Sequence, residues 1–240
     1  MVRAILLDLD DTLYDEAAYM RSGFAAVAVG IAGMTGYAPA AVLEVLLDVE
    51  RREGRGRVFD TALTAFGMTA GSDVVQDLVT VYRSHRPRIE LHAGARELLA
   101  RLRRRGRTAI VTDGLPLIQR RKIAALGLES AVDAVVYTWD LGAPKPDPAG
   151  YLDALARLGA TPAEAVVVGD NPRHDLVAAR AIGARAIRVL RGRFGSVPAP
   201  AGAEPDLEIA DIGALEPALD ELEVPASANA GYAEGVAAHA

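Results

Sequence analysis

Residues 4–12, AILLDLDDT, join an apolar run to three aspartates and decide the fold of this chain. The first four residues have no polar position, which is typical of a strand covered on both faces in a parallel sheet. Asp8, Asp10 and Asp11 follow with no basic residue between them. Carboxylates that lie close together repel one another, so this strand end needs a compensating positive charge. We therefore expect a ligand site there.

Four more apolar runs follow along the chain. They are residues 107–113, 131–138, 164–170 and 185–190. The last run is more polar and is expected nearer the edge of the sheet. Helical patterns lie between the runs, and each is expected to stop at a glycine. These glycines are Gly106, Gly127, Gly159 and Gly183. Strands that alternate with such helices indicate βαβ units.

Residues 15–90 interrupt this alternation with helical stretches and no convincing strand. Because the interruption follows the first strand, it predicts a separate helical insertion. The predicted fold class is α/β, a Rossmann-like parallel sheet with helices on both faces, plus an inserted α-helical cap. The predicted domains are a core of residues 1–14 and 91–222, a cap of residues 15–90 and a flexible tail of residues 223–240.

Composition excludes several classes of protein. The chain has 240 residues, is 51% hydrophobic and carries a net charge of −6, which argues against a disordered chain and against a general nucleic-acid binder. It has no cysteine, so disulfides and thiolate metal sites are excluded. We found no secretory leader and no uninterrupted apolar stretch of spanning length. We expect a cytoplasmic protein without membrane or nucleic-acid partners.

Aspartates recur at the ends of the predicted strands. The first strand ends at Asp8 and Asp10, and the fourth ends at Asp170. Asp175 follows five residues later, within reach of the same edge. Ligands of open α/β sheets bind at the carboxyl ends of the strands, where these side chains should meet. Carboxylates, carbonyls and water are the ligands that Mg²⁺ prefers, so the sequence predicts a magnesium site.

Four motifs in chain order resemble those of the haloacid dehalogenase superfamily. They are DLDDT at 8–12, Thr112 in VTDG, Lys145 in PKPDP and GDNPRHD at 169–175. The resemblance extends to about residue 195 and includes an insertion similar to the helical type-I cap of that superfamily. It implies a hydrolase of the phosphatase type.

The resemblance also implies residue roles. Asp8 would be the nucleophile and would form an aspartyl-phosphate. Asp10 would protonate the leaving oxygen and then activate water. Mg²⁺ would be bound by Asp8, by the backbone carbonyl of Asp10 and by Asp170, with Asp175 as a ligand or as a residue that orients the ligands. Asp11 and Thr12 would support the turn after the strand.

The predicted phosphate-binding residues are Thr112, Asp113 and Lys145. Thr112 would donate its hydroxyl to the phosphoryl group, and Lys145 would hold that group beside Asp8. Arg55 and Arg57, in the arginine-rich stretch 51–57 of the predicted cap, are candidates for substrate selection. The alternative for this stretch is a solvated connector between helices.

The expected function is hydrolysis of a small phosphomonoester such as a sugar phosphate or a nucleotide, by a monomer or homodimer. Dehalogenases of the superfamily lack an acid at the position of Asp10. Phosphonatases use a lysine from the cap, and residues 15–90 contain none. A phosphomutase shares every motif and stays an alternative. A receiver-like phosphoswitch is the non-enzymatic alternative, although receivers need no inserted cap.

Overall fold

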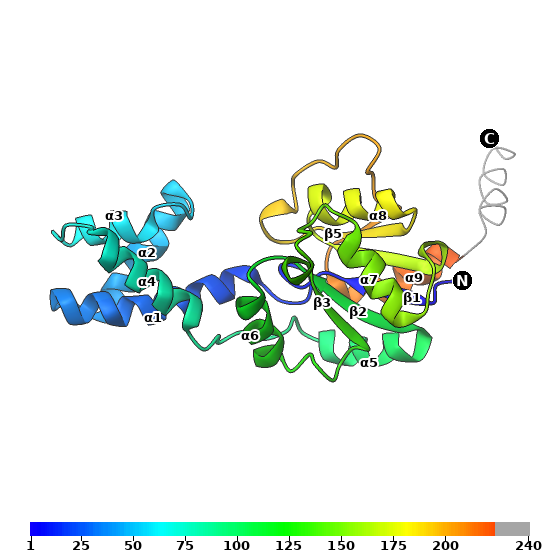
Figure 1. Cartoon of the computed structure of the whole chain (residues 1–240), viewed down its shortest axis with the longest axis horizontal. Helices are drawn as coiled ribbons and strands as arrows, with labels where there is room; N and C mark the ends of the chain where they lie inside the picture. The colour runs from blue at the N-terminus through cyan, green and yellow to red at the C-terminus, as the bar shows by residue number, and fades with distance from the viewer. Residues whose placement is uncertain (224–240) are drawn as a thin grey trace, which may run out of the picture. The chain divides into compact units, whose positions relative to one another are not determined.

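The computed structural model describes residues 1–223, which form two compact units (Figure 1). The first unit, here the sheet unit, comprises Met1–Tyr14, Leu91–Gln119 and the described chain from Gly127 onward. The second, the helical unit, comprises Asp15–Glu90 and Arg120–Leu126. The tail predicted at 223–240 lies outside the described residues, apart from Glu223.

The sheet unit contains a six-stranded sheet, counted over the described residues, in the order β3-β2-β1-β4-β5-β6. Every neighbouring pair of strands is parallel. The strands are β1 (Ala4–Leu7), β2 (Arg107–Thr112), β3 (Ala134–Tyr137), β4 (Ala165–Gly169), β5 (Arg185–Val189) and β6 (Leu207–Ile209). The chain proceeds outward from β1 to β3 and then returns to the other side of β1. The resulting switch point lies between β1 and β4, where a ligand crevice is expected in such sheets.

The predicted α/β fold class is confirmed, with one strand missed. β6 is only three residues long, so it is too short to show a period in the sequence. It pairs with β5 in parallel. The more polar run at 185–190 is therefore one strand in from the edge, and β6 is the edge strand.

Helices pack against the sheet through alternating strand residues. Ala4 and Leu6 of β1 belong to one apolar cluster with Tyr151 and Ala178. Side chains alternate across a strand, so this cluster covers one face of the sheet. α7 and α8 supply that cover, whereas α5 packs against β2 and lies on the opposite side of the sheet from α8 (Figure 1). The helices of the sheet unit are α5 (Ala95–Arg105), α7 (Ala149–Leu158), α8 (Val177–Ile182) and α9 (Leu215–Glu223). α6 (Pro116–Leu126) begins in the sheet unit, and its residues Arg120–Leu126 belong to the helical unit.

The helical unit has its own apolar core. Its helices are α1 (Glu16–Thr35), α2 (Pro39–Glu53), α3 (Val58–Ala65) and α4 (Ser72–Ser84). Within the described part of the chain, α1 is long and apolar enough to cross a membrane by length and composition, although no stretch of spanning length was expected from the sequence. However, its residues Phe24, Val27 and Ile31 are buried with Leu46 of α2 in this core. Packing in this core therefore accounts for the apolar residues on the buried side of α1.

Three of the four predicted glycine stops have the left-handed backbone expected of them. Gly127, Gly159 and Gly183 have φ of 61°, 63° and 76°. Gly106 differs, because its backbone is extended. A Cβ at Gly106 would lie 2.8 Å from the carbonyl oxygen of Arg3, so this glycine allows a close backbone approach beside the start of β2.

Candidate active site

Asp8 lies directly after β1, beside the switch point of the sheet. Its backbone amide donates to the carbonyl of Val168 in β4 over 2.8 Å, which fixes the position of the residue. Its carboxylate accepts from Nζ of Lys145 at 2.6 Å and from Oγ1 of Thr12 at 3.3 Å. Burial raises the pKa of Asp8 to about 7, with Asp175 and Asp10 adding to the rise and Lys145 opposing it. The Asp8 carboxylate is therefore buried among charged groups.

Lys145 brings a buried positive charge to these acids. Its Nζ lies 2.6 Å from Asp8 and 2.7 Å from Asp175, and the residue is 5% exposed. Burial alone would lower the pKa of Lys145, but Asp175 and Asp8 raise it well above its ordinary value. The lysine is therefore a permanent cation beside Asp8. A single ammonium group does not neutralise every carboxylate around it.

Asp170 is a buried acid with a carboxyl oxygen that has no hydrogen-bond partner. It follows β4 and is 3% exposed, and its buried Oδ2 has no hydrogen-bond partner. Burial raises its pKa to about 9, and Asp8 and Asp175 contribute to the rise. Oxygen atoms of Asp8, Asp170 and Asp175 all lie within 4.8 Å of one another. An unpaired carboxylate oxygen in such a group fits a divalent cation.

Asp175 binds three donors. Its Oδ1 accepts from Nζ of Lys145 and from the hydroxyl of Tyr151, both at 2.7 Å. Its Oδ2 accepts from the backbone amide of Asn171 at 3.1 Å. These contacts orient Lys145 and the turn after β4. Asp175 is also one of the three grouped acids, so its role as a metal ligand and its role as an orienting residue both stay predictions.

Asp10 turns its side chain to different partners. Its Oδ2 accepts from Nε2 of Gln119 at 2.8 Å, and its Oδ1 accepts from the hydroxyl of Tyr14. The next residue, Asp11, has a φ of 56°, which is uncommon for a residue other than glycine. The Asp10 carboxylate is therefore held by Tyr14 and Gln119, while it still adds to the rise in the pKa of Asp8.

The two predicted phosphate-binding residues at the end of β2, Thr112 and Asp113, have distinct contacts. Thr112 is 1% exposed, and its hydroxyl lies 2.6 Å from Nε2 of Gln119. Oδ1 of Asp113 accepts from the backbone amide of Lys145 at 2.9 Å and from the hydroxyl of Thr138. The Asp113 side chain therefore holds the loop that carries Lys145.

Arg55 and Arg57 belong to the helical unit. Arg55 forms ion pairs with Glu16 at 3.0 Å and with Glu50 at 3.7 Å. It also lines a cavity of about 320 Å³ in this unit, together with the aromatic residue Phe59. Arg57 is exposed and directly precedes α3. The structure thus places the other seven predicted residues in the sheet unit and these two in the helical unit.

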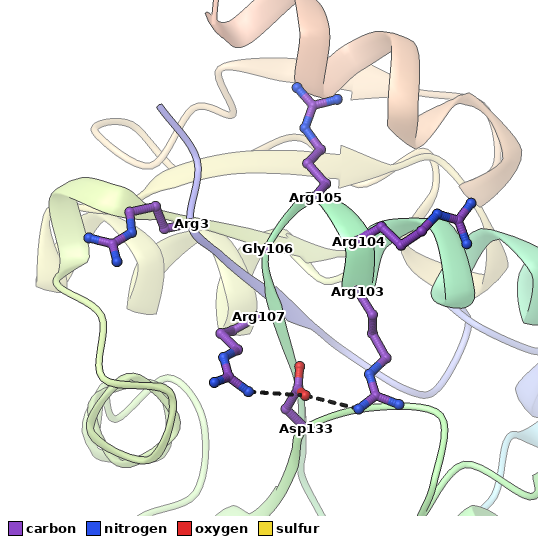
Figure 2. A pocket seen from close by; sticks show the side chains of 7 residues that line it. All are labelled: Arg3, Arg103, Arg104, Arg105, Gly106, Arg107 and Asp133. Carbon is purple, nitrogen blue, oxygen red and sulfur yellow. Dashed lines mark hydrogen bonds and ion pairs between the residues drawn. The ribbon is translucent and has the colours of Figure 1, made fainter.

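The sheet unit has a hollow of its own, which is rich in arginine but does not gather these charges into an anion site. It has a volume of about 440 Å³ and lies at the amino end of β2. Its lining residues are Arg3, Arg103, Arg104, Arg105, Gly106, Arg107 and Asp133. In Figure 2, Arg103 and Arg107 approach Asp133 from two sides and pair with it, whereas the side chains of Arg3, Arg104 and Arg105 point in different directions. Arg3 and Arg105 pair with acids outside the hollow, so the positive charge is dispersed over the surface.

The residues that sequence reasoning missed and that touch the predicted ones include Tyr14, Gln119, Thr138 and Tyr151. Tyr14 lies four residues after Asp10, and a tyrosine in the turn after an acidic strand end is the only sequence signal for it. Gln119 and Tyr151 lie on the inner faces of α6 and α7. They meet their partners through tertiary packing, which a single sequence does not reveal.

The chain is similar in sequence to known proteins. A family model described as haloacid dehalogenase-like hydrolase matches residues 2–183. A phosphoserine phosphatase of Thermus thermophilus is 37% identical over 159 residues, which are 66% of this chain and 62% of that protein. The match thus spans less than two thirds of that relative's length. A glyceraldehyde 3-phosphate phosphatase of Methanopyrus kandleri is 30% identical over 219 residues, which are 87% of this chain and 93% of that protein.

Solved structures share the fold. A 2-haloacid dehalogenase of Pseudomonas syringae has a TM-score of 0.63 and 26% identity, with 92% of this chain and 100% of that chain covered. A phosphatase of Thermococcus onnurineus has a TM-score of 0.59 and 24% identity, with 91% and 98% covered. The likeness at such low identity concerns the fold, and chemistry has to be argued from the residues.

Proposed function

Because the chain belongs to the haloacid dehalogenase-like hydrolases, and its relatives are named as phosphatases, we propose that it is a Mg²⁺-dependent phosphatase of a small phosphorylated metabolite. The observation that carries this proposal is the buried group of Asp8, Lys145 and Asp170. It combines an oxygen nucleophile, a fixed cation and an acid with an unpaired oxygen. Phosphoryl transfer needs positioning and charge neutralisation above all, which this group offers.

Mg²⁺ fits the donor set of the site. Asp8 and Asp170 would supply carboxylate oxygens, and the backbone carbonyl of Asp10 would supply a third ligand, as the family resemblance implies. Asp175 would contribute as a ligand or by orienting the others. When bound, the ion would neutralise charge on the phosphate and on the carboxylates. The unpaired Oδ2 of buried Asp170 is the atom that supports this assignment.

Asp8 would attack the phosphorus atom and form an aspartyl-phosphate. Lys145, 2.6 Å from the carboxylate, would stabilise the negative charge that the incoming phosphate brings. Asp175 and Tyr151 would keep the lysine in place through the shared Oδ1. Thr112 would donate its hydroxyl to the phosphoryl group. The chain thereby supplies both the nucleophile and the cation that tempers its charge.

Asp10 would handle the proton. It would protonate the leaving oxygen as the bond from phosphorus to that oxygen breaks, and would then take a proton from the water that hydrolyses the intermediate. An acid at this position is required when an alcohol leaves, whereas halide departure requires none. Asp10 therefore favours a phosphatase over a dehalogenase of the same fold.

The substrate is proposed to be a small-molecule phosphomonoester, handled in the cytoplasm without nucleic-acid or membrane partners. Phosphoserine and glyceraldehyde 3-phosphate head the panel to be tested, because relatives of this chain are named for them. Arg55 and Arg57 are proposed to select among such substrates.

The proposal is tested by incubating the protein with this panel and measuring free phosphate, with Mg²⁺ and with EDTA. We expect Mg²⁺-dependent release by wild type and none by a folded Asp8→Asn variant, because an amide is not a nucleophile here. Near-normal turnover by Asp8→Asn would refute the role of Asp8. A sugar phosphate converted to its isomer without phosphate release would instead identify a mutase.

A further inference from the structure

Both oxygens of the Asp10 carboxylate are bound by residues that the proposed function does not use. Tyr14 donates its hydroxyl to Oδ1, and Gln119 donates its amide to Oδ2 over 2.8 Å. A carboxylate bound at both oxygens cannot turn about its last bond without losing one of these hydrogen bonds. These two side chains therefore restrict the orientation of the Asp10 carboxyl group.

Gln119 also connects Asp10 to the end of β2. Its Nε2 lies 2.6 Å from the hydroxyl oxygen of Thr112 and 2.8 Å from the carbonyl oxygen of Asp113. Carboxylate and carbonyl oxygens can only accept, so the atom that faces them is the amide nitrogen. Gln119 is 2% exposed, so bulk water does not compete for these contacts. The side chain thus fixes Asp10 relative to Thr112.

Tyr14 is itself held in place by its backbone. It is paired as an isolated bridge with Asp10 on one side and with Leu91 on the other. The carbonyl of Leu13, its neighbour, accepts from the amide of His92 at 3.0 Å. The Tyr14 side chain is fully buried. Its hydroxyl is therefore presented to Asp10 from a rigid support.

We propose that Tyr14 and Gln119 are positioning residues that aim the Asp10 carboxyl group at the leaving oxygen, an inference that rests on the proposed phosphatase function. In the step concerned, Asp8 forms a bond to phosphorus while the bond to the leaving oxygen breaks. The proton of Asp10 moves to that oxygen, so that the product leaves as a neutral alcohol and Asp10 becomes a carboxylate. A leaving group that is stable as an anion needs no such proton.

The test compares two leaving groups in Tyr14→Phe and Gln119→Met, each of which removes a donor and keeps a similar side-chain volume. Phenyl phosphate has the poorer leaving group and 4-nitrophenyl phosphate the better one. We expect kcat/KM for phenyl phosphate to fall at least about tenfold, and that for 4-nitrophenyl phosphate to change by no more than about twofold. Tyr37→Phe, the same change at an exposed position of the helical unit, should leave both values unchanged.

Asp10→Asn supplies the comparison for a lost proton donor, and it should show the same dependence on the leaving group. Adding Gln119→Met to Asp10→Asn should then change little, because residues that act through one group are not additive. Thermal melting shows whether each variant is folded. If one single variant unfolds, the other decides, because each removes a different donor.

Equal losses on both substrates, or unchanged rates on both, would overturn the inference. The proposed function is tested by a separate measurement, the activity of the wild-type protein on 4-nitrophenyl phosphate. Absence of that activity overturns the proposed function and the inference together. Wild-type activity with an unchanged ratio between the two substrates in both variants overturns the inference alone.

Discussion

The carboxyl groups of Asp8 and Asp170 hold protons more tightly in the folded protein than in the unfolded chain. Burial raises their pKa values from 3.8 to about 7 and about 9. A carboxyl group with a raised pKa stabilises the fold fully below its unfolded pKa, and this contribution is lost as the pH rises through the folded pKa. The metal-free protein should therefore become less stable as the pH rises from about 4 to about 9.

Mg²⁺ should offset this loss. We expect the increase in Tm on adding Mg²⁺ to be larger at about pH 8 than at about pH 5, because protons compete with the metal for the same oxygens. The measurement is thermal melting at constant ionic strength, with Mg²⁺ or with EDTA. Asp170→Asn is the control and should reduce the increase at the higher pH. An increase that is larger at low pH would contradict the assignment of the metal site.

At the scale of elements, the close packing of β2 beside the amino-terminal segment depends on Gly106. A Cβ there would lie 2.8 Å from the carbonyl oxygen and 3.1 Å from the carbonyl carbon of Arg3, both backbone atoms. We expect Gly106→Ala to lower the free energy of unfolding by about 1–3 kcal/mol, because the backbone has to shift. Gly56→Ala is the matched control, since nothing lies within 4 Å of its Cβ position. Denaturant unfolding that showed equal stability for both variants would contradict the packing argument.

The strands that could be predicted from the sequence are those buried on both faces, because such burial requires an unbroken run of apolar residues. β1, β2 and β4 are buried on both faces, so their composition identified them. β6 lies at the edge of the sheet and has only three residues, one of them buried. It is therefore too short and too exposed to show a recognisable run of apolar residues. The prediction that Gly106 would have a left-handed backbone was wrong. A glycine is needed there because the backbone of Arg3 lies too close to leave room for a Cβ atom.

In the candidate site, too, some residues could be predicted from the local sequence, whereas the contacts that depend on tertiary packing could not. Asp8 and Asp170 could be placed from the sequence, because parallel strands bring their carboxyl ends to one edge. The contact between Lys145 and Asp8 joins residues 137 positions apart, and only the resemblance to a family indicated it. The donors on Asp10 come from a turn and from α6, and no local pattern marks Gln119. Such contacts required the structure.

At the scale of the whole molecule, the chain combines two units with separate apolar cores. The sheet unit contains the proposed catalytic residues, and the helical unit contains Arg55 and Arg57. Because the two sets of residues lie in different units, we expect substitutions in the helical unit to change substrate selection without changing the proposed catalytic residues.

The proposed role of Arg55 and Arg57 predicts a substrate-dependent effect. Replacing both with alanine should raise KM several-fold to about tenfold for the best substrate of the panel, because guanidinium groups bind anionic groups strongly. The KM for 4-nitrophenyl phosphate should change much less. Arg51→Ala with Arg52→Ala is the control, since both arginines are exposed and paired with Asp48. Unchanged kinetics on the best substrate would identify residues 51–57 as a solvated connector.

The claim that Asp8 carries the transferred phosphoryl group is tested most directly by trapping the phosphorylated protein. Substrate with an isotopically labelled phosphoryl group is mixed with the Mg²⁺-loaded protein, quenched in acid during turnover, digested and analysed by mass spectrometry. We predict the label on the peptide that contains Asp8, formed and lost fast enough to account for turnover, and absent in Asp8→Asn. Full turnover without label on Asp8, or with label on another residue, would contradict the account.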